Sequence, residues 1–246
     1  GGIKNMLAIW KREVQNYFLT PIGYVFMGVF LLCGGVFFFL SNIASSSSSL
    51  ETLFGNMIYL FMLVMPILTM RLLSEEKRTK SDQLLLTSPL SITQIVVGKF
   101  LAAATVLFAT MVVMLIYVVI ICCYSTPYPG MIVSNYLGFF LVGCCYVSIG
   151  VLMSALTENQ VSAAVLTFGA NLLLQILESL SSSLTIPTLG FINLNTVLSW
   201  MSLYKRYYDF TAGILSFANV LYYVSFCFVI LFLAVRVIDK RRWSEG

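Results

Sequence analysis

The chain has 246 residues, of which 59% are hydrophobic and 10% charged, and its mean hydropathy is +0.94. Water-soluble domains carry about 25% charged residues, so this composition argues against a soluble enzyme, a nucleic-acid-binding protein and a secreted disulfide scaffold. The chain contains no histidine, which removes histidine-based catalysis and most zinc chemistry. We therefore expect an all-α integral membrane protein, because helices satisfy their own backbone polar groups in lipid.

Residues 1–20 predict an amphipathic helix that lies in the plane of the membrane and connects to the first span. At helical spacing, its apolar face carries Ile3, Leu7, Trp10, Val14 and Tyr17. Its polar side carries Lys11, Arg12 and Glu13. Thr20 and Pro21 then predict the N-cap and first turn of the next helix.

Residues 21–246 form a second unit with six long apolar runs, each long enough to cross about 30 Å of hydrocarbon as a helix. The expected transmembrane spans cover residues 21–40, 53–73, 92–123, 136–156, 161–180 and 220–238. Two helix starts carry the spacing of a capping box, Ser91 with Gln94 and Thr157 with Gln160.

The basic residues predict the orientation. In this topology, 12 of the 14 Lys and Arg fall on one side of the membrane. Because the positive side faces the cytoplasm, we expect both termini to be cytoplasmic. Lys99 and Arg236 lie near the inner face, where they can snorkel to the interface. The middle of every expected span lacks Asp, Glu, Lys and Arg, which gives poor support to a proton- or sodium-coupled relay.

Two loop segments each allow two interpretations. The inner segment Leu73–Ser91 mixes charges of both signs, and is either a solvated loop or a docking element for a cytoplasmic partner. The outer segment Ser181–Asn219 is rich in aromatic residues, which suit the membrane–water interface. It is either an aromatic belt or a gate, built from short helices that dip toward the bilayer.

No nucleotide-binding, metal or catalytic site is legible. A Walker A loop has the pattern G-x-x-x-x-G-K-[ST], but the only Gly-Lys pair, Gly98-Lys99, is followed by Phe100. The adjacent cysteine pairs lack the spacing of a zinc or redox site. If the protein uses ATP, another chain must bind it.

The stretch Pro66–Pro89, followed by Ile95–Phe100, resembles the ABC-2 type permeases, the membrane subunits of bacterial ABC transporters. Weaker matches are Gly150–Gln160, Gly213–Ser216 and Arg241–Trp243. Within that family the chain is most similar to the permeases associated with gliding motility and with nitrous-oxide-reductase maturation. The likeness extends over nearly the whole chain.

The resemblance implies a type V exporter-like fold of six helices after an interfacial connecting helix, in the bacterial plasma membrane. It implies a dimer with a second copy or a homologous permease, and a cytoplasmic ATP-binding subunit that holds ATP and Mg²⁺. An accessory membrane protein with an extracytoplasmic domain, and lipid, are further expected partners; nucleic acid is not. The docking surface for the ATP-binding subunit is expected at Glu75, Glu76, Lys77, Arg78, Thr79, Asp82 and Gln83, with Thr157, Glu158 and Asn159 as a second contact and the N-terminal helix as a third.

Two alternatives to an ATP-driven permease stay open. A secondary carrier with inverted repeats has broken helices at matched places in its two halves, and Pro66 in the second span has no counterpart in the fifth. The second alternative is a non-transporting scaffold that anchors soluble partners, which the sequence alone does not exclude.

Overall fold

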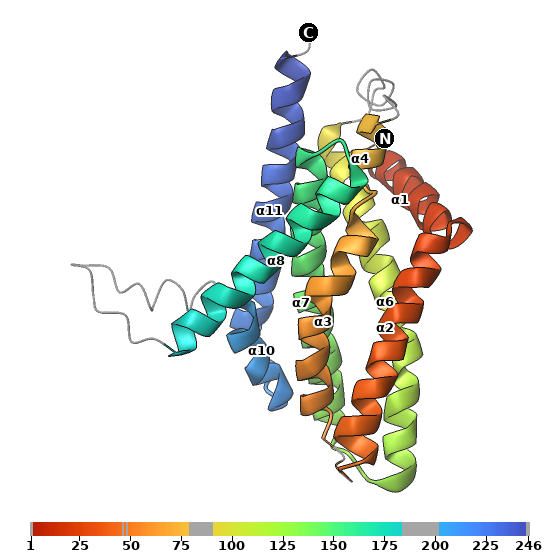
Figure 1. Ribbon diagram of the computed structural model, residues 1–246, viewed down its shortest axis with the longest axis vertical. Coiled ribbons are helices and arrows are strands. Elements are labelled where there is room, and N and C mark those ends of the chain that lie inside the picture. Colours follow the sequence, from red (N-terminus) through yellow and green to blue (C-terminus); the bar gives the residue numbers. More distant parts are fainter. Residues whose placement is uncertain (1, 46, 48, 79–90, 184–201, 245–246) are drawn as a thin grey trace, which may run out of the picture.

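The computed structural model describes residues 2–45, 47, 49–78, 91–183 and 202–244 (Figure 1). All the regular structure in these ranges is helical. In chain order the helices are α1 (Gly2–Leu19), α2 (Pro21–Phe38), the π-helix η1 (Phe39–Ile43), α3 (Glu51–Thr69), α4 (Ser74–Arg78), α6 (Ile92–Tyr124), α7 (Pro129–Leu156), α8 (Gln160–Ser183), α10 (Leu203–Thr211) and α11 (Phe217–Ser244).

Six helical segments in the described part of the chain are long and apolar enough to cross a membrane. They cover Pro21–Ile43, Glu51–Arg78, Ile92–Tyr124, Pro129–Leu156, Gln160–Leu177 and Phe217–Lys240. The expected fold class, an all-α membrane protein with six transmembrane helices, is confirmed. The residues of the expected outer segment that lie in 184–201 fall outside the described residues, and α10 is the short helix that follows them.

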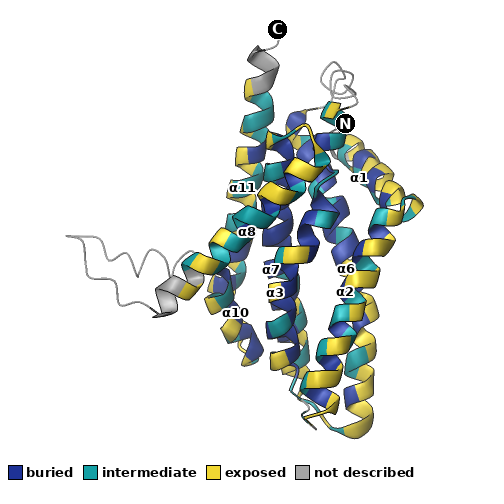
Figure 2. Ribbon diagram, viewed as in Figure 1, coloured by how far each residue is buried: buried dark blue, intermediate teal, exposed yellow. Residues whose placement is uncertain are grey.

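Helices α3 and α7 form the centre of the bundle, and the other spans surround them (Figures 1 and 2). Within the most apolar window of each span, 72% of the α7 residues and 67% of those in the α3 span are buried, against 11% for α11. Helix α7 packs against α3, α6, α8, α10 and α11. The peripheral helices therefore leave large apolar surfaces exposed, as lipid-facing helices do.

Two glycines on α7 allow its neighbours to approach closely. A Cβ atom at Gly150 would lie 2.1 Å from Thr69 Oγ1 on α3, and one at Gly143 would lie 2.5 Å from Leu107 Cδ2 on α6. Small residues at helix contacts are typical of membrane bundles, in which packing rather than the hydrophobic effect drives association. Aromatic rings add to the contact between α3 and α7, where the ring centroids of Phe61 and Phe139 lie 4.5 Å apart.

Of the two predicted capping boxes, one is confirmed and one is wrong. Ser91 and Gln94 form the reciprocal pair of hydrogen bonds at the start of α6. At the start of α8 the cap is Asn159, whose Oδ1 accepts from the backbone N–H of Val161 at 2.9 Å. Thr157 instead donates back to the Met153 carbonyl at 3.3 Å, because it lies directly after the end of α7 and three residues before α8 begins.

Thr20 occupies the predicted N-cap position of α2, but its side chain does not cap that helix. Its hydroxyl donates to the Asn16 carbonyl of α1 at 2.7 Å. Thr20 therefore closes the end of α1 at the sharp corner where Pro21 begins α2.

Helices α1 and α4, the turn between α7 and α8, and the end of α11 lie at the same end of the bundle, which is uppermost in Figure 1. We call this the charged end, because it gathers Arg12, Glu13, Arg71, Glu75, Glu76 and Lys99. Both termini lie on this side, as an even number of spans requires.

Candidate functional site

The face that helix α1 turns toward the protein only partly matches the one that its apolar spacing predicts. Trp10, Val14 and Tyr17 of the predicted face pack against the core. The buried residues of α1 are Ile9, Glu13 and Tyr17, and they share one face at intervals of four. Leu7, expected on the apolar face, is 48% exposed. The prediction that Glu13 lies on the polar side with Lys11 and Arg12 is therefore wrong, because α1 packs along α6 and directs Glu13 into the bundle.

Polar and apolar contacts together hold α1 against its neighbours. Trp10 Nε1 donates to Thr105 Oγ1 of α6 at 2.9 Å, and the Tyr17 hydroxyl donates to the Leu68 carbonyl of α3 at 2.6 Å. Burial, and secondarily the charge of Glu13, raises the pKa of Tyr17, so this hydroxyl keeps its proton and remains a donor. Gly98 lets Ile9 approach α6, since a Cβ at Gly98 would lie 3.0 Å from Ile9 Cγ2.

Lys99 of α6 is the centre of an ion-pair cluster. Its ammonium lies 3.2 Å from Glu13 Oε1 of α1 and 2.8 Å from Glu76 Oε1 of α4, and only 2% of its side chain is exposed. The expectation that Lys99 snorkels to the interface is thus wrong, because two carboxylates compensate its charge inside the protein. One side chain therefore joins three helices that are far apart in sequence.

Two arginines surround this cluster. Arg12 Nη2 lies 3.0 Å from Glu13 Oε1 and 3.4 Å from Glu76 Oε1. Arg71 forms a bidentate pair with Glu75, with Nε–Oε2 at 2.5 Å and Nη2–Oε1 at 2.7 Å. Bidentate geometry makes an arginine–carboxylate pair stronger and more directional than a single contact. The six charged groups sum to zero.

Helix α4 also lies against the end of α7. Ser154 Oγ accepts from the backbone N–H groups of Leu73 and Ser74, at 3.0 and 3.1 Å. Lys77 Nζ donates to the Ala155 carbonyl. Since Ala155 is two residues before Thr157, the structure brings together the two stretches of sequence that were expected to dock a partner.

The predicted docking residues divide into three groups. Glu75, Glu76 and Lys77 engage other residues of this chain, as described above. Arg78, Glu158 and Asn159 are exposed at the charged end, and Thr157 is half-buried. The remaining three lie outside the described residues: Thr79, Asp82 and Gln83.

Sequence reasoning missed the internal role of Glu13 and Lys99. The available signal was a basic residue two turns into an apolar run, together with an acidic residue on an otherwise apolar helix face. Neither feature indicates its partner, because residues 13, 76 and 99 are far apart along the chain. In the residues that the structure describes, no group of three or more Cys, Asp and Glu side chains is placed to hold a metal ion.

Comparison with known families decides the class of this bundle. Residues 40–238 match the model of the ABC-2 family transporter proteins, which is well over half of the chain. The chain belongs to the ABC-2 transporter family. A search of curated proteins returned no match.

Membership of the ABC-2 family makes this chain a multi-pass membrane permease component of an ABC transporter. Membrane components of this family are typically non-catalytic and generally work with an ATP-binding subunit. The match begins at residue 40, so α1 and all of α2 precede it. Within the matched region lie α4, Lys99 and the α7–α8 turn, whereas Glu13 and Arg12 lie before it.

Proposed function

We propose that this chain couples ATP hydrolysis by a separate cytoplasmic subunit to export, or to mechanical work, across the membrane. The observation that carries the proposal is the convergence at the charged end. Helix α4, the α7–α8 turn and α1 come together there, and Lys99 connects α4 and α1 to the long span α6. The chain itself offers no nucleotide-binding loop, so the ATP and Mg²⁺ belong to the partner.

The docking surface is proposed at the exposed residues of this end. Arg78 is the last residue of α4, and Glu158 and Asn159 form the tip of the α7–α8 turn. Charged groups of both signs fix the register between two surfaces and favour the correct partner. The sequence prediction that Thr79, Asp82 and Gln83 extend this surface stays part of the proposal.

Glu76 has a different role in this proposal: it transmits movement. Separating a buried ammonium from one of its carboxylates costs several kcal/mol. A displacement of α4 by the partner is therefore coupled to α6 and α1 through Lys99, rather than being absorbed by the loop. Helix α6 has 33 residues, about 50 Å at 1.5 Å per residue, so it spans the whole bundle.

Separate variants test docking and transmission. We expect the double variant Arg78→Glu/Glu158→Lys to lose the ATP-binding subunit during purification in mild detergent. Glu76→Gln should keep that subunit bound but lower the coupled ATPase activity, because the hydrogen-bonding shape remains while the charge pairing is lost. Lys205→Glu, an exposed charge change on α10, is the control and should retain both properties.

The outcome of this experiment also decides between the alternatives. A chain that purifies without an ATP-binding subunit in several detergents would favour the carrier or the scaffold. A bound subunit whose ATPase activity ignores Glu76→Gln would contradict transmission through Lys99 while leaving docking intact.

The finer assignments extend the same proposal. The functional unit contains a second permease copy or a homologous permease, in a bacterial plasma membrane with both termini cytoplasmic. The likeness to gliding-motility and nitrous-oxide-maturation permeases suggests an accessory protein with an extracytoplasmic domain. Mass spectrometry of the purified complex identifies each of these components.

A further inference from the structure

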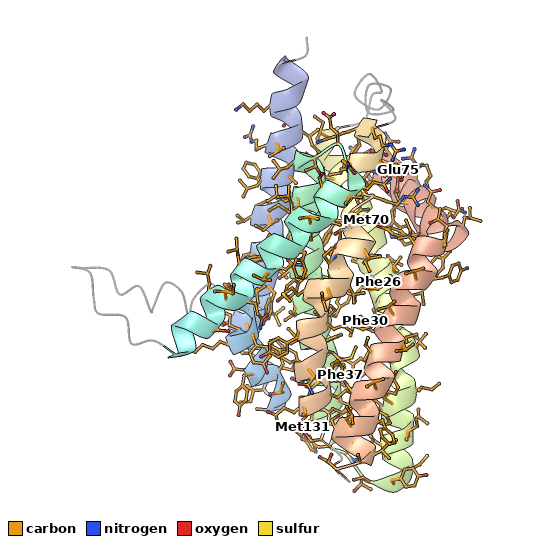
Figure 3. All side chains as sticks on the ribbon, in the orientation of Figure 1. Phe26, Phe30, Phe37, Met70, Glu75 and Met131 are labelled. Carbon is orange, nitrogen blue, oxygen red and sulfur yellow. The ribbon has the colours of Figure 1, made fainter. Side chains whose placement is uncertain are left out.

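A cavity of about 390 Å³ lies at the charged end, under the corner between α1 and α2. Its wall combines α1, the first turn of α2, the segment from Arg71 to Glu76, and Lys99 of α6. In Figure 3 Glu75 lies at this end among the nitrogen and oxygen atoms beside α1. The volume falls within the range of about 300–1,000 Å³ that is typical of small-molecule sites.

The cavity is lined by charged side chains whose net charge is zero. It contains the cations of Arg12, Arg71 and Lys99 and the carboxylates of Glu13, Glu75 and Glu76. A ligand with a large net charge would leave part of that charge uncompensated in a partly buried site. A zwitterion, which carries one charge of each sign a few ångströms apart, matches the lining without such a cost.

Several hydrogen-bond donors on this wall are unused by the protein. Arg12 bonds through Nη2 alone, and Arg71 through Nε and Nη2. Arg12 Nε and Nη1 and Arg71 Nη1 therefore have no partner among the described residues, and neither does the side-chain amide of Asn16. Two guanidinium groups and an amide that face one cavity are a suitable set of donors for a phosphate group.

The cavity lies at the boundary of the membrane-spanning region. The first span begins at Pro21, directly after the cavity residue Thr20. Beside it, exposed apolar side chains extend down the outer surface of the bundle from Leu19 through Tyr24 and Val25. A ligand that fits this position has a polar head for the cavity and an apolar tail that runs along α2.

We propose that the cavity binds the headgroup of a phosphatidylethanolamine-type lipid. The phosphate meets Arg12, Arg71 and Asn16. The ammonium faces Glu75, whose carboxylate is the most exposed of the three, with 37% of the side chain accessible. A bound lipid then lies between α1 and the Arg71–Glu76 segment, next to the Lys99 cluster, so that headgroup binding adds a contact across this junction.

Native mass spectrometry of the full-length protein tests the proposal. The protein is reconstituted in nanodiscs with equal amounts of phosphatidylethanolamine, phosphatidylglycerol and phosphatidylcholine, and is then released with increasing collision energy. We expect one phosphatidylethanolamine per chain to be the last lipid lost. Removal of one charge-assisted hydrogen bond should lower its retention about tenfold.

Two variants with matched controls locate the lipid. Arg71→Gln should lose the retained lipid, whereas Arg236→Gln, an exposed arginine on α11, should keep it. Asn16→Asp places a negative charge against the phosphate and should also lose the lipid. Asn16 is exposed, and its side chain makes no hydrogen bond to the described residues. Its neighbour Gln15 is also exposed and does not line the cavity, so Gln15→Asp is the control.

Three results would overturn the proposal. The first is retention of the three lipids in equal amounts. The second is a retained lipid that survives both Arg71→Gln and Asn16→Asp. The third comes from delipidated protein: if inorganic phosphate raises its Tm as much as glycerophosphoethanolamine does, and Arg71→Gln abolishes both effects, the cavity is a site for a free anion and not for a lipid.

Discussion

Two short helices, α4 and α10, pack against the same central helix α7, and they are held there by different forces. Of the five residues of α4 only Ser74 is buried. The helix is held by an ion pair to Lys99 and by hydrogen bonds to Ser154 and Ala155. In the nine residues of α10 four are buried, including Tyr207 and Phe210. Ion pairs and directional hydrogen bonds therefore position α4, whereas the close packing of buried side chains positions α10.

The packing of α10 leaves little freedom. Phe210 is fully buried and lies so close to α7 that a Cβ at Gly138 would be 2.7 Å from its ring. The Tyr223 hydroxyl of α11 donates to the Leu203 carbonyl at 2.6 Å, which fixes the start of the helix. Close packing permits few alternative arrangements, whereas polar contacts can be exchanged for others or for water. The comparison indicates that α4 is the element suited to movement and α10 the fixed one.

The largest expected effect is at Lys99. Lys99→Ala removes the buried cation between Glu13 and Glu76 and leaves both carboxylates with only the exposed Arg12 as a partner. This loss should cost about 3–5 kcal/mol of stability. The triple variant Glu13→Gln/Lys99→Met/Glu76→Gln removes all three charges and should restore most of that loss. Unfolding of each variant in denaturing detergent measures the difference. A triple variant as unstable as Lys99→Ala would show that the ion pairs do not dominate this junction.

A smaller effect is expected from Phe210→Ala. In soluble proteins this change costs about 3–5 kcal/mol of stability. Part of that cost is the free energy gained when the phenylalanine side chain moves from water into the protein interior. Because a lipid environment reduces the transfer part, we expect about 2 kcal/mol here, measured by the same unfolding assay. No neutralising partner mutation should rescue this variant, in contrast to Lys99→Ala. Phe217→Ala, at an 80% exposed phenylalanine, is the matched control and should be close to neutral.

The smallest effect is expected at Arg12. Its side chain is 53% exposed, and exposed ion pairs contribute about 0.2–1 kcal/mol. Arg12→Gln should therefore lower stability by that amount at low salt, and by less at high salt because the charges are screened. Unfolding at two ionic strengths tests this. An effect as large as that of Lys99→Ala would place Arg12 in the buried part of the cluster.

The fold was largely predictable from the sequence. Apolar length locates the six spans, and hydropathy locates them well because a helix must satisfy its backbone within the bilayer. The cap at Ser91 was predictable because it depends on residues three apart. The cap at Thr157 was predicted wrongly, because the same spacing holds for a residue that ends one helix shortly before another begins.

The faces of the helices were not predictable. In a soluble protein the buried side of a helix is apolar and the exposed side polar, but lipid-facing residues are as apolar as buried ones. Nothing in the composition of α7 or α11 therefore indicates that the first is central and the second peripheral. Glu13 was placed on the wrong side of α1 for another reason: the cation that compensates its charge inside the bundle, Lys99, is distant in the chain.

The sequence by itself determined that this protein is an all-α membrane protein with six spans and its positive charge gathered on one side, since these properties depend on local composition. The tertiary structure decided that Glu13, Glu76 and Lys99 meet and that α4 lies against the end of α7. It also decided that a cavity lined by equal numbers of positive and negative side chains opens beneath α1. These contacts join residues that are distant in the chain, and only the packing of the helices brings their charges within a few ångströms of one another.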